Sequence, residues 1–235
     1  MEAGVGTIAD RVRTVLDEMH RAAARAGRLP ESVRLVAASK TVSIERLRQA
    51  VDAGVRHLGE NRLQEALPKI DGLGREGVIW HFIGSLQRRK AKSVVGRFET
   101  IHSVDSLGLA EEIDRQAKAV GLRQRVLLEV NLGGEASKGG FEPTTLVAAL
   151  ESLNGLEHLD IRGLMAIPPP TPTAEAARPY FRQLRTLAQG LTARGYKNIN
   201  MQELSMGMSH DYPVAIEEGA TYVRVGTAIF GARGE

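Results

Sequence analysis

The segment "VRLVAASKTVSIERLRQAVDAG", residues 33–54, joins two patterns that together indicate the fold. From Leu35 to Ser39 it is a run of apolar and small residues, which is typical of a buried strand. From Ser43 the apolar residues follow a helical spacing up to Gly54, and glycine commonly ends a helix. Between the two patterns stands Lys40, an ammonium at the end of a strand.

This strand-then-helix unit recurs along the whole chain. The predicted strands cover residues 33–39, 55–60, 78–84, 100–104, 125–132, 159–167, 198–207 and 221–231. The predicted helices cover residues 43–54, 106–121, 142–155 and 174–195, after an amphipathic helix over Thr7–Ala26. Such alternation predicts a parallel sheet with right-handed crossovers.

Eight strands in 235 residues predict an α/β fold, a single (β/α)8 TIM-type barrel with an extra N-terminal helix. No linker divides the chain, so we expect one domain over residues 1–235. An open doubly wound sheet is the alternative, but no G-x-G-x-x-G motif follows the first strand. The glycine-rich segment 131–141 is predicted to form a mobile loop at the rim.

Composition excludes several classes of protein. The chain has no cysteine, so disulfides, thiolate metal sites and cysteine nucleophiles are excluded. We expect no metal site, because the six histidines lack zinc-site spacing. A net charge of +3 and 4% aromatic residues argue against nucleic-acid binding, although "QRRKAK", residues 87–92, keeps it as an alternative. With no signal sequence and no long apolar run, we expect a cytoplasmic protein that does not bind membranes.

In such a barrel the active site lies at the carboxyl ends of the strands. Polar residues near the ends of the first three strands are Lys40, Asn61 and His81. The loops after the seventh and eighth strands combine hydroxyl groups with glycines: Ser205, Gly207, Ser209, Gly226 and Thr227. Glycines let backbone amides approach an anion, so these loops predict a phosphate site, while simple turns remain the alternative.

Period-two alternation predicts where the side chains of the first and last strands point. Val223 and Val225 should pack on the outer helices, so Arg224 faces the barrel interior. A buried guanidinium needs a partner, either a ligand or a salt bridge to Glu129 or Glu203.

Lys40 shares the inward face of the first strand with Val36 and Ala38. A partly desolvated amine beside another cation is more readily neutral, as a Schiff base requires. With the phosphate loops at the same rim, a cofactor with an aldehyde and a phosphate fits: pyridoxal 5'-phosphate (PLP). Arg224 would face its ring nitrogen and, because arginine only donates, keep that nitrogen unprotonated and the ring a weak electron sink.

Motifs spread from Leu35 to Gly231 resemble one known family: "LVAASKT", "GENRLQEA", "WHFIGSLQRRK", "IHSVDS", "SKGGF", "LSMGMSHDY" and "RVGTAIFG". They are similar to those of the pyridoxal phosphate homeostasis proteins, relatives of the N-terminal barrel of alanine racemase. The resemblance implies PLP binding and a role in balancing PLP and amino-acid pools, without established catalysis. The sequence departs from the family pattern at "GENR" and "QRRK", which add charge near the rim.

The resemblance also assigns residues. It implies an internal aldimine on Lys40 and a contact between Arg224 and the pyridine nitrogen. The implied phosphate ligands are Ser205, Gly226 and Thr227, and the implied pocket residues are Asn61 and His81, the latter against the ring face. PLP-dependent apoenzymes are the partners to expect if the protein delivers PLP.

A PLP-dependent racemase is the first alternative function. Racemisation needs an acid/base on each face of the substrate, and alanine racemase takes the second one, a tyrosine, from a second domain. This chain ends at Glu235, soon after the eighth strand, so we expect negligible racemase activity and, without that domain's dimer interface, a monomer. A Schiff-base aldolase is the second alternative, but such barrels usually carry their lysine on a later strand.

Overall fold

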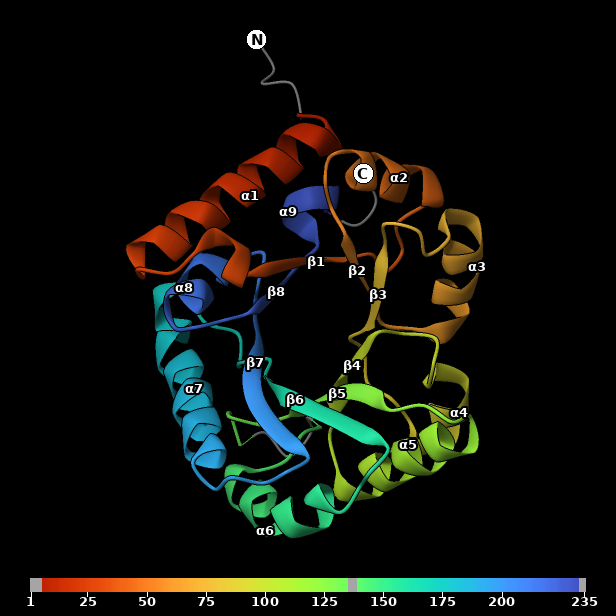
Figure 1. The fold of residues 1–235 in the computed structure, drawn as a ribbon. Coiled ribbons are helices and arrows are strands. Elements are labelled where there is room, and N and C mark those ends of the chain that lie inside the picture. Colours follow the sequence, from red (N-terminus) through yellow and green to blue (C-terminus); the bar gives the residue numbers. More distant parts are fainter. Residues whose placement is uncertain (1–5, 135–138, 233–235) are drawn as a thin grey trace.

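Eight parallel strands close into a barrel in the computed structural model, which describes residues 6–134 and 139–232 (Figure 1). Each strand pairs with the next along the chain, and the last pairs with the first. The strands are β1 (Arg34–Ala38), β2 (His57–Glu60), β3 (Ile79–Phe82), β4 (Thr100–Val104), β5 (Gln124–Glu129), β6 (Leu159–Met165), β7 (Ile199–Met208) and β8 (Tyr222–Val225). The predicted (β/α)8 barrel is confirmed.

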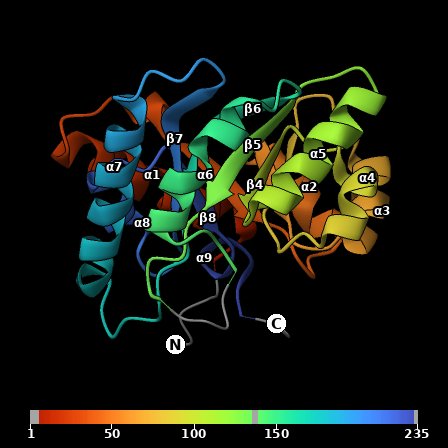
Figure 2. The ribbon, with the colours of Figure 1, turned by 90° about the horizontal axis from the view of Figure 1, so that it is seen from below.

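Helices form the outer ring of the barrel, and Figure 2 shows α7 and α5 flanking the strands from opposite sides. The helices are α1 (Ile8–Arg25), α2 (Ile44–Asp52), α3 (Leu63–Leu73), α4 (Ala91–Val94), α5 (Leu107–Ala119), α6 (Pro143–Asn154), α7 (Arg178–Thr192), α8 (Tyr212–Glu217) and α9 (Thr227–Phe230). Among the described residues no helix is both long and apolar enough to cross a membrane.

The extra N-terminal helix α1 begins with a capping box. The Thr7 hydroxyl accepts from the backbone N–H of Asp10, and the Asp10 carboxylate accepts from the backbone N–H of Thr7. The buried stripe predicted from the sequence, including Val12, Val15 and Met19, faces the rest of the protein. It packs against α2, α8 and α9, which closes the helical ring on that side (Figure 1).

The apolar core has two layers, as the period of the strands requires. Inside the barrel, Val36 and Tyr222 belong to a small apolar cluster, against which Ala38 packs. Outside it, Val223 and Val225 belong to the large cluster shared with the helices. The predicted orientation of the first and last strands is therefore confirmed.

One predicted segment differs in the structure, and another lies partly outside the described residues. The last strand was predicted to run to residue 231, but β8 ends at Val225 and residues 227–230 form the helical turn α9. The rim loop predicted at residues 131–141 includes residues 135–138, which lie outside the described residues. The motif "SKGGF" begins within the same four residues.

Candidate functional site

Lys40 lies two residues beyond the end of β1, at the start of a strained turn. Its ammonium group has no hydrogen bond or ion pair within the described ranges. The next residue, Thr41, has a φ of 62°, and the left-handed region costs a non-glycine residue about 1–3 kcal/mol. Two hydrogen bonds hold this turn, from Thr41 N–H to Glu65 Oε2 at 3.0 Å and from the Thr41 hydroxyl to the Lys40 carbonyl at 2.6 Å. Strain of this kind is typical of functional sites, and no pattern in the sequence indicated it.

A buried ion pair supports the turn from behind. Lys69 Nζ on α3 donates to Glu60 Oε1 and to the Ser39 carbonyl, both at 2.7 Å. The Ser39 hydroxyl donates to the same Glu60 oxygen at 2.6 Å. Burial raises the pKa of Glu60, although the bonds from Lys69 and Ser39 act in the opposite direction. This network joins β1, β2 and α3 directly behind Lys40, and sequence reasoning missed both charged members.

A cavity of about 270 Å³ opens beside Lys40, where β1 and β8 end. It is lined by Ala38, Lys40, Thr41, Val42, Arg46, Gly226, Thr227, Phe230, Gly231 and Ala232. Gly226 lies close to β1, because a Cβ on it would be 3.4 Å from the Cβ and the carbonyl oxygen of Ala38. The structure thus brings together three predicted site residues, Lys40, Gly226 and Thr227.

Ser209 joins this group from the loop after β7. Its Oγ accepts hydrogen bonds from the backbone N–H groups of Gly226 and Ala228, both at 3.2 Å. Two backbone donors therefore converge on one oxygen, which is how loops bind anions. Gly207, predicted for the same phosphate site, has a packing reason to be glycine. Its φ is 89°, and a Cβ there would lie 2.5 Å from the Cβ of Ala215 on α8.

Arg224 lies deeper in the barrel, opposite Val36 on β1. Its Nη1 donates to Ser205 Oγ at 2.5 Å and its Nη2 to the Ala166 carbonyl at 2.9 Å. Burial lowers the pKa of Arg224 to about 10, so the guanidinium stays charged at neutral pH. Two of its five N–H groups have these partners, which leaves donors for a ligand.

The salt bridge considered as an alternative for Arg224 is not found among the described residues. Glu203 pairs instead with Arg34, at 3.1 Å. Glu129 lines a separate hollow of about 180 Å³, and burial, assisted by the charge of Asp105, raises its pKa to about 6. Arg224 opposes that rise without forming an ion pair.

His81 and Ser205 lie in the barrel interior and are not among the described residues that line the cavity beside Lys40. Both are fully buried. His81 contacts His57 and His102 through its two ring nitrogens, at 2.9 and 3.0 Å. The Ser205 hydroxyl contacts His102 at 2.9 Å and Arg224. Sequence reasoning missed His57 and His102, although the second, third and fourth predicted strands each carry one histidine.

Asn61 lies at another hollow, of about 200 Å³, with Arg62, Gln87 and Lys90 in its lining. Its Oδ1 is buried and has no hydrogen-bond partner among residues 6–134 and 139–232. Asn61 is not among the described lining residues of the cavity beside Lys40.

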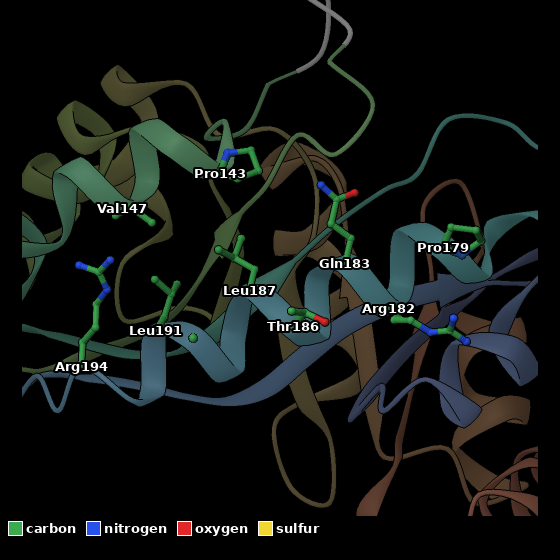
Figure 3. A pocket seen from close by; sticks show the side chains of 10 residues that line it. Pro143, Val147, Pro179, Arg182, Gln183, Thr186, Leu187, Leu191 and Arg194 are labelled. Carbon is green, nitrogen blue, oxygen red and sulfur yellow. The ribbon is translucent and has the colours of Figure 1, made fainter.

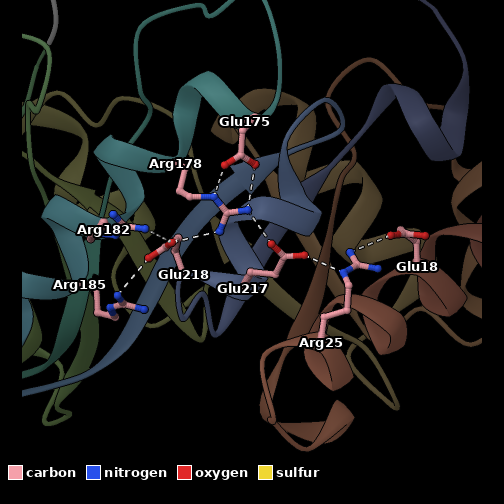
Figure 4. Close-up of polar contacts among 8 residues, drawn as sticks. All are labelled: Glu18, Arg25, Glu175, Arg178, Arg182, Arg185, Glu217 and Glu218. Carbon is pink, nitrogen blue, oxygen red and sulfur yellow. Dashed lines mark hydrogen bonds and ion pairs between the residues drawn. The ribbon is translucent and has the colours of Figure 1, made fainter.

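The remaining features lie on the outer helices. A groove of about 600 Å³ lies between α6 and α7 and has Val147, Leu187 and Leu191 in its lining (Figure 3). An ion-pair network joins α1, α7 and α8 (Figure 4), in which Glu217 and Glu218 meet arginines of the other two helices. In the part of the chain that the structure describes, no group of three or more side chains could hold a metal ion.

The relatives of this chain agree with the fold. Residues 16–234 match the family model described as the alanine racemase N-terminal domain. The pyridoxal phosphate homeostasis protein of Aquifex aeolicus is 46% identical over 95% of this chain and 97% of its own length. The chain belongs to the pyridoxal phosphate homeostasis protein family.

Two solved structures place this family member among close structural neighbours. PipY of Synechococcus elongatus, solved with PLP bound, is 43% identical with a TM-score of 0.80, and the match covers 91% of this chain and 100% of that one. A protein from Bifidobacterium adolescentis described as unknown is 42% identical with a TM-score of 0.90, and the match covers 95% of this chain and 94% of that one.

Proposed function

We propose that this chain binds PLP at the barrel mouth through a Schiff base on Lys40 and takes part in intracellular PLP homeostasis. The observation that carries the proposal is that Lys40, Gly226 and Thr227 line one cavity. The PLP-bound structure of a relative with 43% identity supports the same choice of cofactor.

The residues present fit each part of PLP. The Lys40 amine would bond the aldehyde carbon, whose oxygen leaves as water. The converging N–H groups at Gly226 and Ala228, with Thr227 between them and Ser209 beside them, suit the phosphate. Arg224 has spare N–H donors for the ring nitrogen. Bound PLP would supply a conjugated, electron-withdrawing ring. Arg224 would keep this ring a weak electron sink, because arginine cannot protonate the ring nitrogen.

The lining of the cavity favours binding over racemisation. Two-base chemistry needs a second proton donor or acceptor facing the lysine. Among the described lining residues, no carboxylate, histidine or tyrosine side chain accompanies Lys40, so the cavity offers no such second group. We therefore expect no deuterium incorporation at the α-carbon of alanine when the PLP-loaded protein is incubated in heavy water.

The test of the proposal is an absorbance spectrum of the protein with PLP, before and after borohydride. We expect a visible band that borohydride abolishes, and peptide mapping that finds the reduced adduct on Lys40. Lys40→Ala should lose the band, while the matched control Lys92→Ala, an exposed lysine on α4, should keep it. A protein that stays colourless with excess PLP, or an adduct on another lysine, would overturn the proposal and bring the aldolase alternative forward.

Further expectations about the working protein follow from the same proposal. We propose that it acts in the cytoplasm as a monomer and that PLP-dependent apoenzymes are its partners. Analytical ultracentrifugation of the PLP-loaded protein should give a single species near the 25.5 kDa of one chain. A dimer at micromolar concentration would contradict the monomer.

A further inference from the structure

The barrel interior contains a continuous chain of hydrogen bonds that ends at Arg224. The ring nitrogens of His57 and His81 are 2.9 Å apart, those of His81 and His102 are 3.0 Å apart, and His102 Nδ1 is 2.9 Å from Ser205 Oγ. Ser205 Oγ in turn accepts from Arg224 Nη1 at 2.5 Å. The side chains come from β2, β3, β4, β7 and β8, so the chain of bonds crosses the barrel.

The direction of every bond in this chain can be deduced from its Arg224 end. A guanidinium only donates, so Ser205 Oγ accepts there. The Ser205 hydroxyl proton then has one acceptor among the described residues, His102 Nδ1, and a buried hydroxyl without an acceptor is costly. His102, as a neutral ring, must carry its proton on Nε2 and donate it to His81 Nδ1.

The same reasoning passes down the remaining bonds. His81, having accepted at Nδ1, carries its proton on Nε2 and donates to His57 Nδ1. All three rings are thus Nε2–H tautomers that point the same way. A charged imidazolium at His81 would place its Nδ1–H against the Nε2–H of His102, and one at His102 would place its Nδ1–H against the hydroxyl proton of Ser205, so this direction of the bonds requires neutral rings there.

The surroundings favour the same neutral state. Burial lowers the pKa of His57 to about 4 and lowers those of His81 and His102 far below the ordinary value. The charges that lower the pKa values of the three rings come from the neighbouring histidines, when they are protonated, and from the guanidinium groups of Arg34, Arg125 and Arg224.

We propose that His102 is a positioning residue for Arg224. By accepting the Ser205 proton, it turns a Ser205 lone pair towards Arg224 Nη1, and the Ala166 carbonyl holds Nη2. These two acceptors fix the plane of a guanidinium that has no carboxylate partner among the described residues. The remaining N–H groups then face a ligand in one orientation. The benefit to PLP binding rests on the proposed function, whereas the order of Arg224 does not.

The test compares two substitutions at one position. In His102→Gln the side-chain oxygen can accept from Ser205 and the amide can donate to His81, so the direction of the chain is retained. In His102→Leu both bonds are lost at similar volume. The first readout is NMR of the full chain without PLP, which reports the histidine tautomers and the Arg224 Nη–H resonances. The second readout is the dissociation constant for PLP.

We expect three Nε2–H tautomers and resolved Arg224 Nη–H resonances in the unsubstituted protein, and the same resonances in His102→Gln. In His102→Leu the separate Arg224 Nη–H resonances should average into one signal. The dissociation constant for PLP should rise about tenfold in His102→Leu and less than about twofold in His102→Gln. If circular dichroism shows that His102→Leu does not fold, Ser205→Ala takes its place with the same expectation.

Two results would overturn the proposal. One is a His102 ring protonated on Nδ1, and the other is Arg224 Nη–H resonances in His102→Leu that match those of the unsubstituted protein. Failure of the unsubstituted protein to bind PLP would contradict the proposed function instead, and the resonances would still decide the positioning role.

Discussion

Replacing Lys69 with methionine would remove the cation behind Lys40 and keep most of the side-chain volume. The Lys69 ammonium bonds Glu60 Oε1 and the Ser39 carbonyl at 2.7 Å each. The Lys69 side chain is 9% exposed and that of Glu60 is 0% exposed, so water cannot replace the lost charge. Glu60 would keep only the Ser39 hydroxyl as a described donor. Removing one partner of a buried pair costs about 3–5 kcal/mol, and we expect Lys69→Met to lose that much unfolding free energy at pH 7.

Urea denaturation measures this loss, and its pH dependence gives an internal check. The pKa of Glu60 is raised in the folded state, and losing Lys69 removes a contact that lowers it. The folded protein therefore holds the Glu60 proton more tightly than the unfolded chain does. The loss should shrink as the pH falls through the folded pKa, because protonation removes the unpaired charge.

The matched control is the double variant Glu60→Gln/Lys69→Met, which buries no uncompensated charge. It should recover at least about half of the stability lost by Lys69→Met, because neutral amides are far less costly to bury than a carboxylate. A single variant that loses less than about 1 kcal/mol, or a double variant as unstable as the single one, would refute the reasoning that Lys69 neutralises a buried carboxylate.

Other substitutions test separate features, each by urea denaturation. Gly207→Ala should lose more than about 2 kcal/mol, since its φ is 89° and the new Cβ would lie 2.5 Å from that of Ala215. The folded pKa of Glu129 is raised to about 6 from 4.5, so ionisation of this carboxyl destabilises the fold. The free energy of unfolding should therefore fall by up to about 2 kcal/mol from pH 4.5 to 7. Glu129→Gln should lack this part of the pH dependence. The Glu218 carboxylate is 5% exposed and faces three arginines, so Glu218→Gln should lower the free energy of unfolding by about 2 kcal/mol. The Glu175 carboxylate is 66% exposed, so Glu175→Gln should lower it by less than about 0.5 kcal/mol. Equal losses at these two glutamates, both drawn in Figure 4, would contradict the importance of burial.

The barrel could be predicted because each of its signals is local. Alternation along a strand decides which side chains face inward, and it separated Arg224 correctly from Val223 and Val225. The end of the last strand was predicted wrongly for an equally local reason. The residues after Val225 are also apolar, and a short apolar run does not distinguish a strand from a buried helical turn such as α9.

The site could be predicted only in part. Alternation along a strand tells whether a side chain points into the barrel, but not how far below the barrel mouth it lies. It placed Lys40, Gly226 and Thr227 at the same rim, where they line one cavity. It could not tell that Ser205, which is in register with Tyr222, lies deep enough to contact the Arg224 guanidinium. Depth depends on the tilt of the strands and on register shifts, such as the irregularity between β7 and β8, which no single segment encodes.

The polar interior also argues that the histidine chain serves the residue at its end. Barrel interiors are usually filled by branched apolar side chains, which need no partners. A buried imidazole is tolerated only when its polar nitrogens are bonded, so His81 depends on both His57 and His102. Such a chain is therefore stabilising only when complete, and substitution of one member leaves its neighbours unsatisfied. An apolar interior would give the same barrel without these buried polar groups, but it would leave Arg224 without the acceptor that Ser205 provides.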